Sequence, residues 1–145
     1  MKEARNIRPQ RAEEDYENFH QLDGRHPWRD AVPEGLVLYP ARKIAGGKVS
    51  YFNFDLAKEM GLISKSHPRR MTRKLHQTIL DTFCLRIINE YDQEHSLKFA
   101  PESLKAHKYM ATRYLQLQHS DKTGRTSGDG RCIWNGVVSR GEKIW

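Results

Sequence analysis

The sequence lacks the features that would cross-link it or embed it in a membrane. Its 145 residues include two cysteines, Cys84 in an apolar helical pattern and Cys132 in a strand pattern, so a disulfide framework is not expected. No apolar run approaches the roughly 18 residues of a membrane span. The first ten residues, MKEARNIRPQ, also lack the apolar stretch of a signal peptide. We therefore expect a cytoplasmic protein with no membrane partner.

Apolar residues are scarce and positive charge is in excess. Hydrophobic residues make up 37% of the chain and charged residues 30%, which is a thin supply for a self-sufficient core. The formal net charge of +7 favours anionic partners without selecting among them. The seven histidines lack the close spacing and the companion cysteines of a zinc site, and no catalytic triad can be assigned. The sequence therefore predicts no metal ligand and no catalytic residue.

The chain divides near residue 32. Residues 1–32 are mostly polar and predict an extended or partly disordered arm, whose aromatic residues Tyr16, Phe19 and Trp28 either dock onto a larger body or lie on the surface of a loose tail. Residues 33–145 carry the periodic patterns and form the folded region. Short strand patterns and one long helical pattern in this region predict an α+β fold.

The first part of the folded region predicts strands followed by a short helix. Residues 36–39 are β-prone and are closed by Pro40, and residues 48–55 alternate after a turn at Gly46 and Gly47. Asp55 is placed to cap a helix over residues 56–60, and Gly61 is placed to end it in a left-handed conformation.

An amphipathic helix is predicted to begin near Pro68. Its apolar stripe runs from Met71 to Tyr91 and predicts that this helix carries most of the local core. A second helix is predicted over residues 100–111, with Pro101 early in it, while residues 109–119 could be helix or strand.

A basic run, HPRRMTRKLH, lies at the start of the predicted amphipathic helix. Arg70, Arg73 and Lys74 would share a helical face, with Arg69 beside them, and such a face can follow a phosphate backbone. The alternative function is therefore a small basic nucleic-acid-binding protein. An ordinary solvated face explains the same residues, because basic patches are nonspecific and cations at a helix N-terminus meet an unfavourable dipole. Nucleic acid is thus not the expected partner.

The glycine-rich stretch Ser127–Arg131 is a candidate phosphate-binding loop. Backbone N–H groups of Gly128 and Gly130 can approach an anion closely, and Arg131 adds a planar cation that matches phosphate oxygens. No Gly-Lys-Ser/Thr follows, so the loop is closer to the kinase type than to a Walker loop. A strand and a hairpin with a turn at residues 139–142 are predicted after it. The other interpretation is a simple Gly-Asp-Gly turn with Arg131 as a surface charge.

Two stretches resemble the selenoprotein O family, kinase-like enzymes that transfer AMP from ATP to protein hydroxyls. SGDGRCIWNG, residues 127–136, is similar to that family's Gly-Asp-Gly-Arg loop, and LYPARKIAGGKVSYFNFDLAKEMGL, residues 38–62, is similar to its N-terminal segment. The family's Gly-His-Gln-Phe-Gly stretch has no clean counterpart before the loop. The resemblance implies an incomplete kinase-like small lobe over residues 33–145.

The resemblance also implies a site and its ligands. Gly128, Gly130 and Arg131 would contact the phosphates of ATP, which the family binds with Mg²⁺ or Mn²⁺, and a protein Ser, Thr or Tyr would accept AMP. In the family, the phosphate-binding lysine, the catalytic aspartate and the metal ligands follow the Gly-Asp-Gly-Arg hairpin, and these 145 residues do not reach them. The expectation is an N-terminal fragment of an adenylyltransferase that is inactive alone and that binds no cofactor tightly alone.

Overall fold

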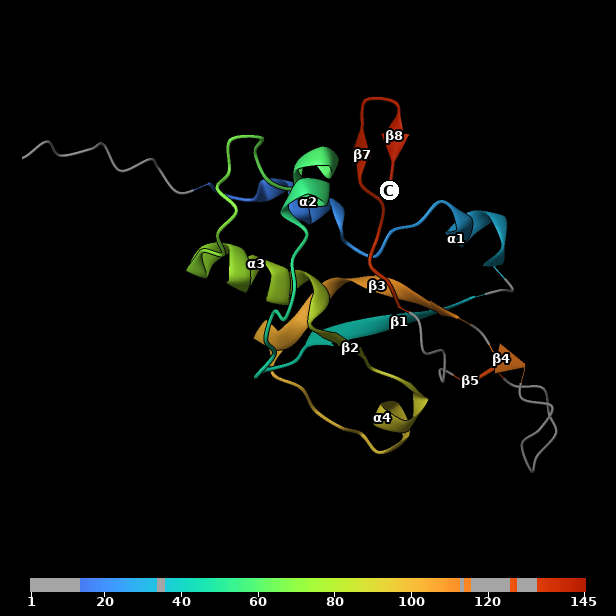
Figure 1. Cartoon of the computed structure of the whole chain (residues 1–145). Coiled ribbons are helices and arrows are strands. Elements are labelled where there is room, and N and C mark those ends of the chain that lie inside the picture. Colours follow the sequence, from blue (N-terminus) through green and yellow to red (C-terminus); the bar gives the residue numbers. More distant parts are fainter. Residues whose placement is uncertain (1–13, 34–35, 113, 116–125, 128–132) are drawn as a thin grey trace, which may run out of the picture.

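The computed structural model of the chain describes residues 14–33, 36–112, 114–115, 126–127 and 133–145. It shows a mixed α+β fold, as predicted, built around a four-stranded antiparallel sheet (Figure 1). The strand order is β2-β1-β3-β6. The bounds of these strands are Leu36–Lys43 for β1, Leu85–Ile87 for β2, Leu104–Thr112 for β3 and Ile133–Trp134 for β6.

The pair β1 and β3 forms the centre of the sheet. Tyr39 lies opposite Tyr109, and both side chains are buried. The prediction that Pro40 closes the first strand is wrong, because β1 continues to Lys43. Proline cannot donate to a strand ladder, and the register between β1 and β3 shifts between Pro40 and Arg42, where such an irregularity accommodates it.

Strand β3 occupies most of the segment that the sequence predicted as a second helix. Only one 3-10 turn, η3 (Pro101–Ser103), precedes the strand, so that helix prediction is wrong. The segment is rich in lysine and alanine, which favour helices when the chain is isolated. Pairing with β1 on one side and with β6 on the other outweighs this preference.

Helix α2 (Phe54–Met60) begins at an asparagine cap. The side chain of Asn53 accepts a hydrogen bond of 3.0 Å from the Leu56 backbone N–H, so the predicted cap at Asp55 is wrong by two residues. Gly61 ends the helix in the left-handed conformation, at φ 78°, as predicted. The strand predicted just before this helix is absent, since residues 47–53 form an irregular segment without strand pairing.

Helix α3 (Arg73–Phe83) is shorter at both ends than predicted. Thr72 caps it by accepting a hydrogen bond of 3.0 Å from the Leu75 N–H, so Pro68 lies outside the helix. The apolar stripe continues past Phe83, but the chain leaves the helix there and enters β2. The last stretch of the predicted helix forms α4 (Glu90–Glu94), whose N-terminus carries a capping box.

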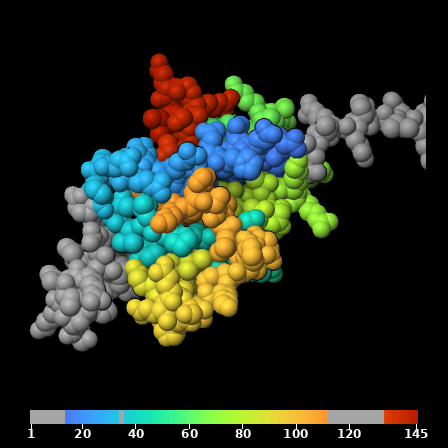
Figure 2. Space-filling view, turned by 180° about the vertical axis from the view of Figure 1, so that it is seen from behind, coloured from blue at the N-terminus to red at the C-terminus, as the bar shows by residue number. Residues whose placement is uncertain are grey.

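The segment predicted as an arm is part of the core from Tyr16 onward. It contains the 3-10 helix η1 (Glu17–Gln21) and the short helix α1 (Trp28–Ala31). Seen from behind, this segment (blue) lies alongside β3 (orange) in Figure 2, and Arg29 Nη2 donates a 3.0 Å hydrogen bond to the carbonyl of Lys108. The Tyr16 hydroxyl lies 2.9 Å from Nε2 of the buried His67. The core cluster contains Tyr16, Phe19, Leu22, Ala57, Leu62, Ile63, Leu75, Ile79 and Val138.

A terminal hairpin packs against α2. Strands β7 (Ser139–Arg140) and β8 (Lys143–Ile144) are joined by the predicted turn, and Val138 before them is fully buried. The Arg140 guanidinium donates hydrogen bonds of 2.7 and 3.1 Å to the carbonyls of Lys58 and Glu59 at the end of α2. These bonds add to the capping of the last carbonyls of α2, of which that of Lys58 also accepts from the Gly61 N–H, and they place a cation at the negative end of the helix dipole.

Candidate functional site

The predicted phosphate-binding loop falls between two strand pairings. Strand β4 (Tyr114–Leu115) pairs with β5 (Thr126–Ser127), with Tyr114 opposite Ser127, and β3 pairs with β6, with Ala111 opposite Ile133. Two residues, 112 and 113, separate these pairings on the outgoing chain, whereas five residues, 128–132, separate them on the return chain. Because five residues face two, a regular ladder cannot continue unbroken across this stretch.

The three predicted site residues, Gly128, Gly130 and Arg131, lie outside the described residues. The structure describes the strands that flank them, β5 before and β6 after. Strand β6 forms the edge of the sheet next to β3. The stretch that carries the predicted site is therefore anchored on both sides by backbone pairing.

Three aromatic rings gather where β6 leaves the loop. The His26 ring centroid lies 4.7 Å from that of Trp134 and 5.3 Å from that of Trp28, and the two indole rings are 5.9 Å apart. The backbone N–H of Trp28 donates a 3.1 Å hydrogen bond to His26 Nδ1, so in the neutral imidazole the ring proton resides on Nε2. We call these three residues the aromatic cluster. Sequence reasoning noticed Trp28 but not the cluster, because Trp134 lies more than 100 residues after His26 and Trp28 in the chain.

An ion pair lies beside the aromatic cluster. Arg25 donates from its side chain to Asp23 at 2.5 Å and from its backbone N–H at 3.1 Å. Burial acts to raise the pKa of the Asp23 carboxyl, but these hydrogen bonds and the nearby positive charges of Arg25 and His107 outweigh it, so the pKa lies below 3.8. Asp23 is therefore ionised at neutral pH and is not free to act as a proton donor.

The basic run considered for nucleic-acid binding is partly neutralised. Arg69 donates two hydrogen bonds of 2.8 Å to the carboxylate of Asp55, and Lys74 forms an ion pair with Asp15. Arg70 precedes α3, so the three cations predicted on one helical face are not all on the helix. The structure thus gives no particular support to a phosphate-tracking face here.

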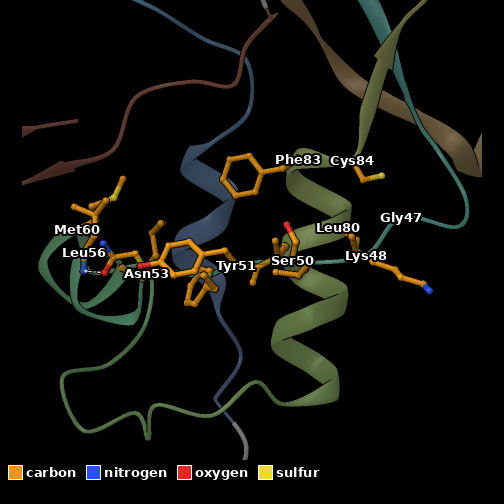
Figure 3. Close-up of a pocket in the computed structure, with 15 residues that line it drawn as sticks. Gly47, Lys48, Ser50, Tyr51, Asn53, Leu56, Met60, Leu80, Phe83 and Cys84 are labelled. Atoms are coloured by element: carbon orange, nitrogen blue, oxygen red, sulfur yellow. Dashed lines mark hydrogen bonds between the residues drawn. The ribbon is translucent and has the colours of Figure 1, made fainter.

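An apolar groove lies between α2 and α3 (Figure 3). Its volume is about 550 Å³, and Leu56 and Met60 of α2 face Leu80 and Phe83 of α3 across it. Among the residues that the structure describes, Lys48 is the one charged residue that lines it. A nucleotide needs several donors for its phosphates, so this groove does not suit ATP.

Within the described ranges, no group of three or more His, Cys, Asp or Glu side chains could hold a metal ion. Nor does this part of the chain contain a helix long and apolar enough to cross a bilayer. Comparison of the chain with protein-family models, with curated proteins and with solved structures gives no match.

Proposed function

We propose that this chain carries the phosphate-binding loop of a selenoprotein O-like protein adenylyltransferase with a kinase-like small lobe. In this proposal, Gly128 and Gly130 present backbone N–H groups to the phosphates of ATP, and Arg131 pairs with a phosphate oxygen. The whole protein would transfer AMP to a hydroxyl of a protein substrate with Mg²⁺ or Mn²⁺.

The observation that carries the proposal is the placement of the loop between two anchored strands. Five residues lie between β5 and β6, whereas two lie between the paired residues of β3 and β4 on the opposite chain. The five include both glycines and the arginine. A stretch of this length that contains two glycines can offer backbone N–H groups to an anion.

The proposed role of these residues is phosphate binding rather than catalysis. Nucleotidyl transfer depends on metal ions and on positioned charges. The family residues that supply them have no counterpart among these 145 residues, so we expect weak ATP binding by the chain and no AMP transfer.

Tryptophan fluorescence provides a test, because Trp134 lies three residues after Arg131 and belongs to the aromatic cluster. Titration with MgATP should change the emission of the wild-type chain. Arg131→Ala should weaken binding about tenfold or more, because a charged hydrogen bond contributes about 1.5–3 kcal/mol. The matched control is Arg86→Ala, an exposed arginine on β2 at the opposite edge of the sheet.

Two results would count against the proposal. One is that the tryptophan emission of the wild-type chain does not change when MgATP is added at millimolar concentration. The other is equal affinity in the Arg131→Ala and Arg86→Ala variants. A parallel assay with labelled ATP and a generic protein acceptor tests the expectation that the chain transfers no AMP. Robust AMP transfer by the 145-residue chain would contradict this expectation.

A further inference from the structure

A second cavity is lined by residues that are far apart in the sequence. Its volume is about 710 Å³, and it is enclosed by the N-terminal segment, by α3 and by the first half of β3. Its walls combine aromatic rings with charged groups. The lining residues include Phe19, Lys43, Asp81, Lys105 and Tyr109.

Lys105 is the cation of this cavity that lacks an ion-pair partner. Its ammonium group donates one hydrogen bond of 2.9 Å, to the backbone carbonyl of Asp81. The Asp81 carboxylate is held instead by Lys43, at 2.9 Å. No ion pair joins Lys105 to a carboxylate anywhere in the described part of the chain. Burial, followed by repulsion from Lys43, lowers the pKa of Lys105 below 10.5, while Asp81 acts in the opposite direction.

The other carboxylates that line the cavity already have cationic partners. Asp23 is bound by Arg25, and Asp15 is paired with Lys74. Lys74 lies outside the lining, but its charge offsets that of Asp15, so all three carboxylates are neutralised and the charge of Lys105 is left uncompensated when the histidines are neutral. An ammonium group offers three donors, and Lys105 has two of them unused. One negative charge on a ligand would complete the charge balance.

Part of the remaining wall is apolar and can hold the body of a ligand. The rings of Phe19 and Tyr109 are buried and line the cavity. The hydroxyls of Thr78 and Thr82 donate to helix carbonyls at 2.9 and 2.8 Å, so they do not offer their protons to a ligand. Of the three lysine and arginine side chains in the described lining, Lys105 is the one whose charge is not already paired with a carboxylate.

We propose that this cavity binds a small organic monocarboxylate, with the carboxylate on the Lys105 ammonium and the apolar body against Phe19 and Tyr109. A monocarboxylate supplies one negative charge and one apolar body, which matches the charge and the walls described. A phosphate monoester would bring more negative charge than one lysine balances. None of the residues proposed to bind the monocarboxylate belongs to the proposed nucleotide loop.

A titration with benzoate, followed by amide chemical shifts, tests the proposal on the full 145-residue chain. The amides of Thr82, Lys105 and Tyr109 should shift with benzoate concentration and should not shift with benzamide, which has the same ring without the charge. Lys105→Gln should weaken benzoate binding about tenfold or more. Lys98→Gln, at an exposed lysine outside the cavity, is the matched control and should leave the affinity unchanged.

Four outcomes would overturn the proposal. They are equal shifts with benzoate and benzamide, benzoate shifts confined to other parts of the chain, full affinity in Lys105→Gln, and tighter binding of inorganic phosphate than of benzoate at these amides. The wild-type shift map decides the position of the site even if the variant is poorly folded.

Discussion

Phe19 provides the sharpest test of the finding that the N-terminal segment belongs to the core. The Phe19 side chain is 3% exposed and lies in the core cluster, whereas Trp28, in the same segment, is 58% exposed. Truncating a buried phenylalanine to alanine costs about 3–5 kcal/mol, the sum of the lost transfer free energy and the cavity left behind. Trp28→Ala loses only ring contacts in the aromatic cluster, which contribute about 1 kcal/mol.

Urea unfolding followed by far-ultraviolet circular dichroism compares these two variants. A denaturant slope of about 2 kcal/mol per molar converts a loss of about 4 kcal/mol into a midpoint lower by about 2 M for Phe19→Ala. The midpoint for Trp28→Ala should fall by about 0.5 M on the same slope. Equal midpoints for the two variants would refute the reasoning, since a loose arm would tolerate both changes alike.

Three further substitutions test individual contacts. Gly24→Ala should destabilise the chain by clearly more than Gly46→Ala. Both glycines have a positive φ, which costs an alanine about 1 kcal/mol. In addition, a Cβ on Gly24 would lie 2.9 Å from the Tyr109 ring, whereas a Cβ on Gly46 would meet nothing within 4 Å. Equal thermal midpoints would contradict this. Asp23→Asn should lower the free energy of unfolding at pH 7. The difference in this free energy between the variant and wild type should shrink as the pH falls below 3.8, because the lowered pKa of Asp23 stabilises the fold only while the carboxylate is ionised. A pH-independent difference would argue against this ion pair. Arg140→Ala should cost about 1–2 kcal/mol in urea unfolding, through loss of the bonds to the end of α2, and an unchanged midpoint would show that they contribute nothing.

The sequence predicted local stop signals better than the extent of the elements. Gly61 was recognised because glycine reaches a left-handed φ without strain. The end of α3 could not be predicted from periodicity, since the apolar stripe continues into Leu85 and Ile87. Their places in β2 depend on pairing with β1, more than 40 residues earlier in the chain.

The misassigned strand β3 has the same physical cause. Residues 104–112 have ordinary helical propensity, and only their two neighbours in the sheet make them extended. The aromatics of the N-terminal segment gave a similarly weak signal: Tyr16 and Phe19 stand among charged residues, and their burial depends on α2 and α3. Local composition predicts the state of a segment poorly when distant partners supply the contacts.

The candidate sites differ in how far the sequence could indicate them. The glycine loop was found from a short motif, because glycines and an arginine are residues that a phosphate requires close together. The cavity at Lys105 joins three segments that are far apart in the chain, and no local pattern marks it. Only the fold shows that the Asp81 carboxylate pairs with Lys43 and that Lys105 forms no ion pair within the described part of the chain.

Phosphorus NMR of ATP tests the central claim most directly, because it reports on the phosphates themselves. With the wild-type chain, the β- and γ-phosphate resonances should shift or broaden, inorganic triphosphate should reverse the effect, and adenosine should not. At equal ATP concentration, Arg131→Ala should strongly reduce the change while Arg86→Ala retains it. Unaltered phosphate resonances with the wild-type chain, or an equal effect in Arg131→Ala and wild type, would contradict the assignment of this loop to nucleotide phosphates.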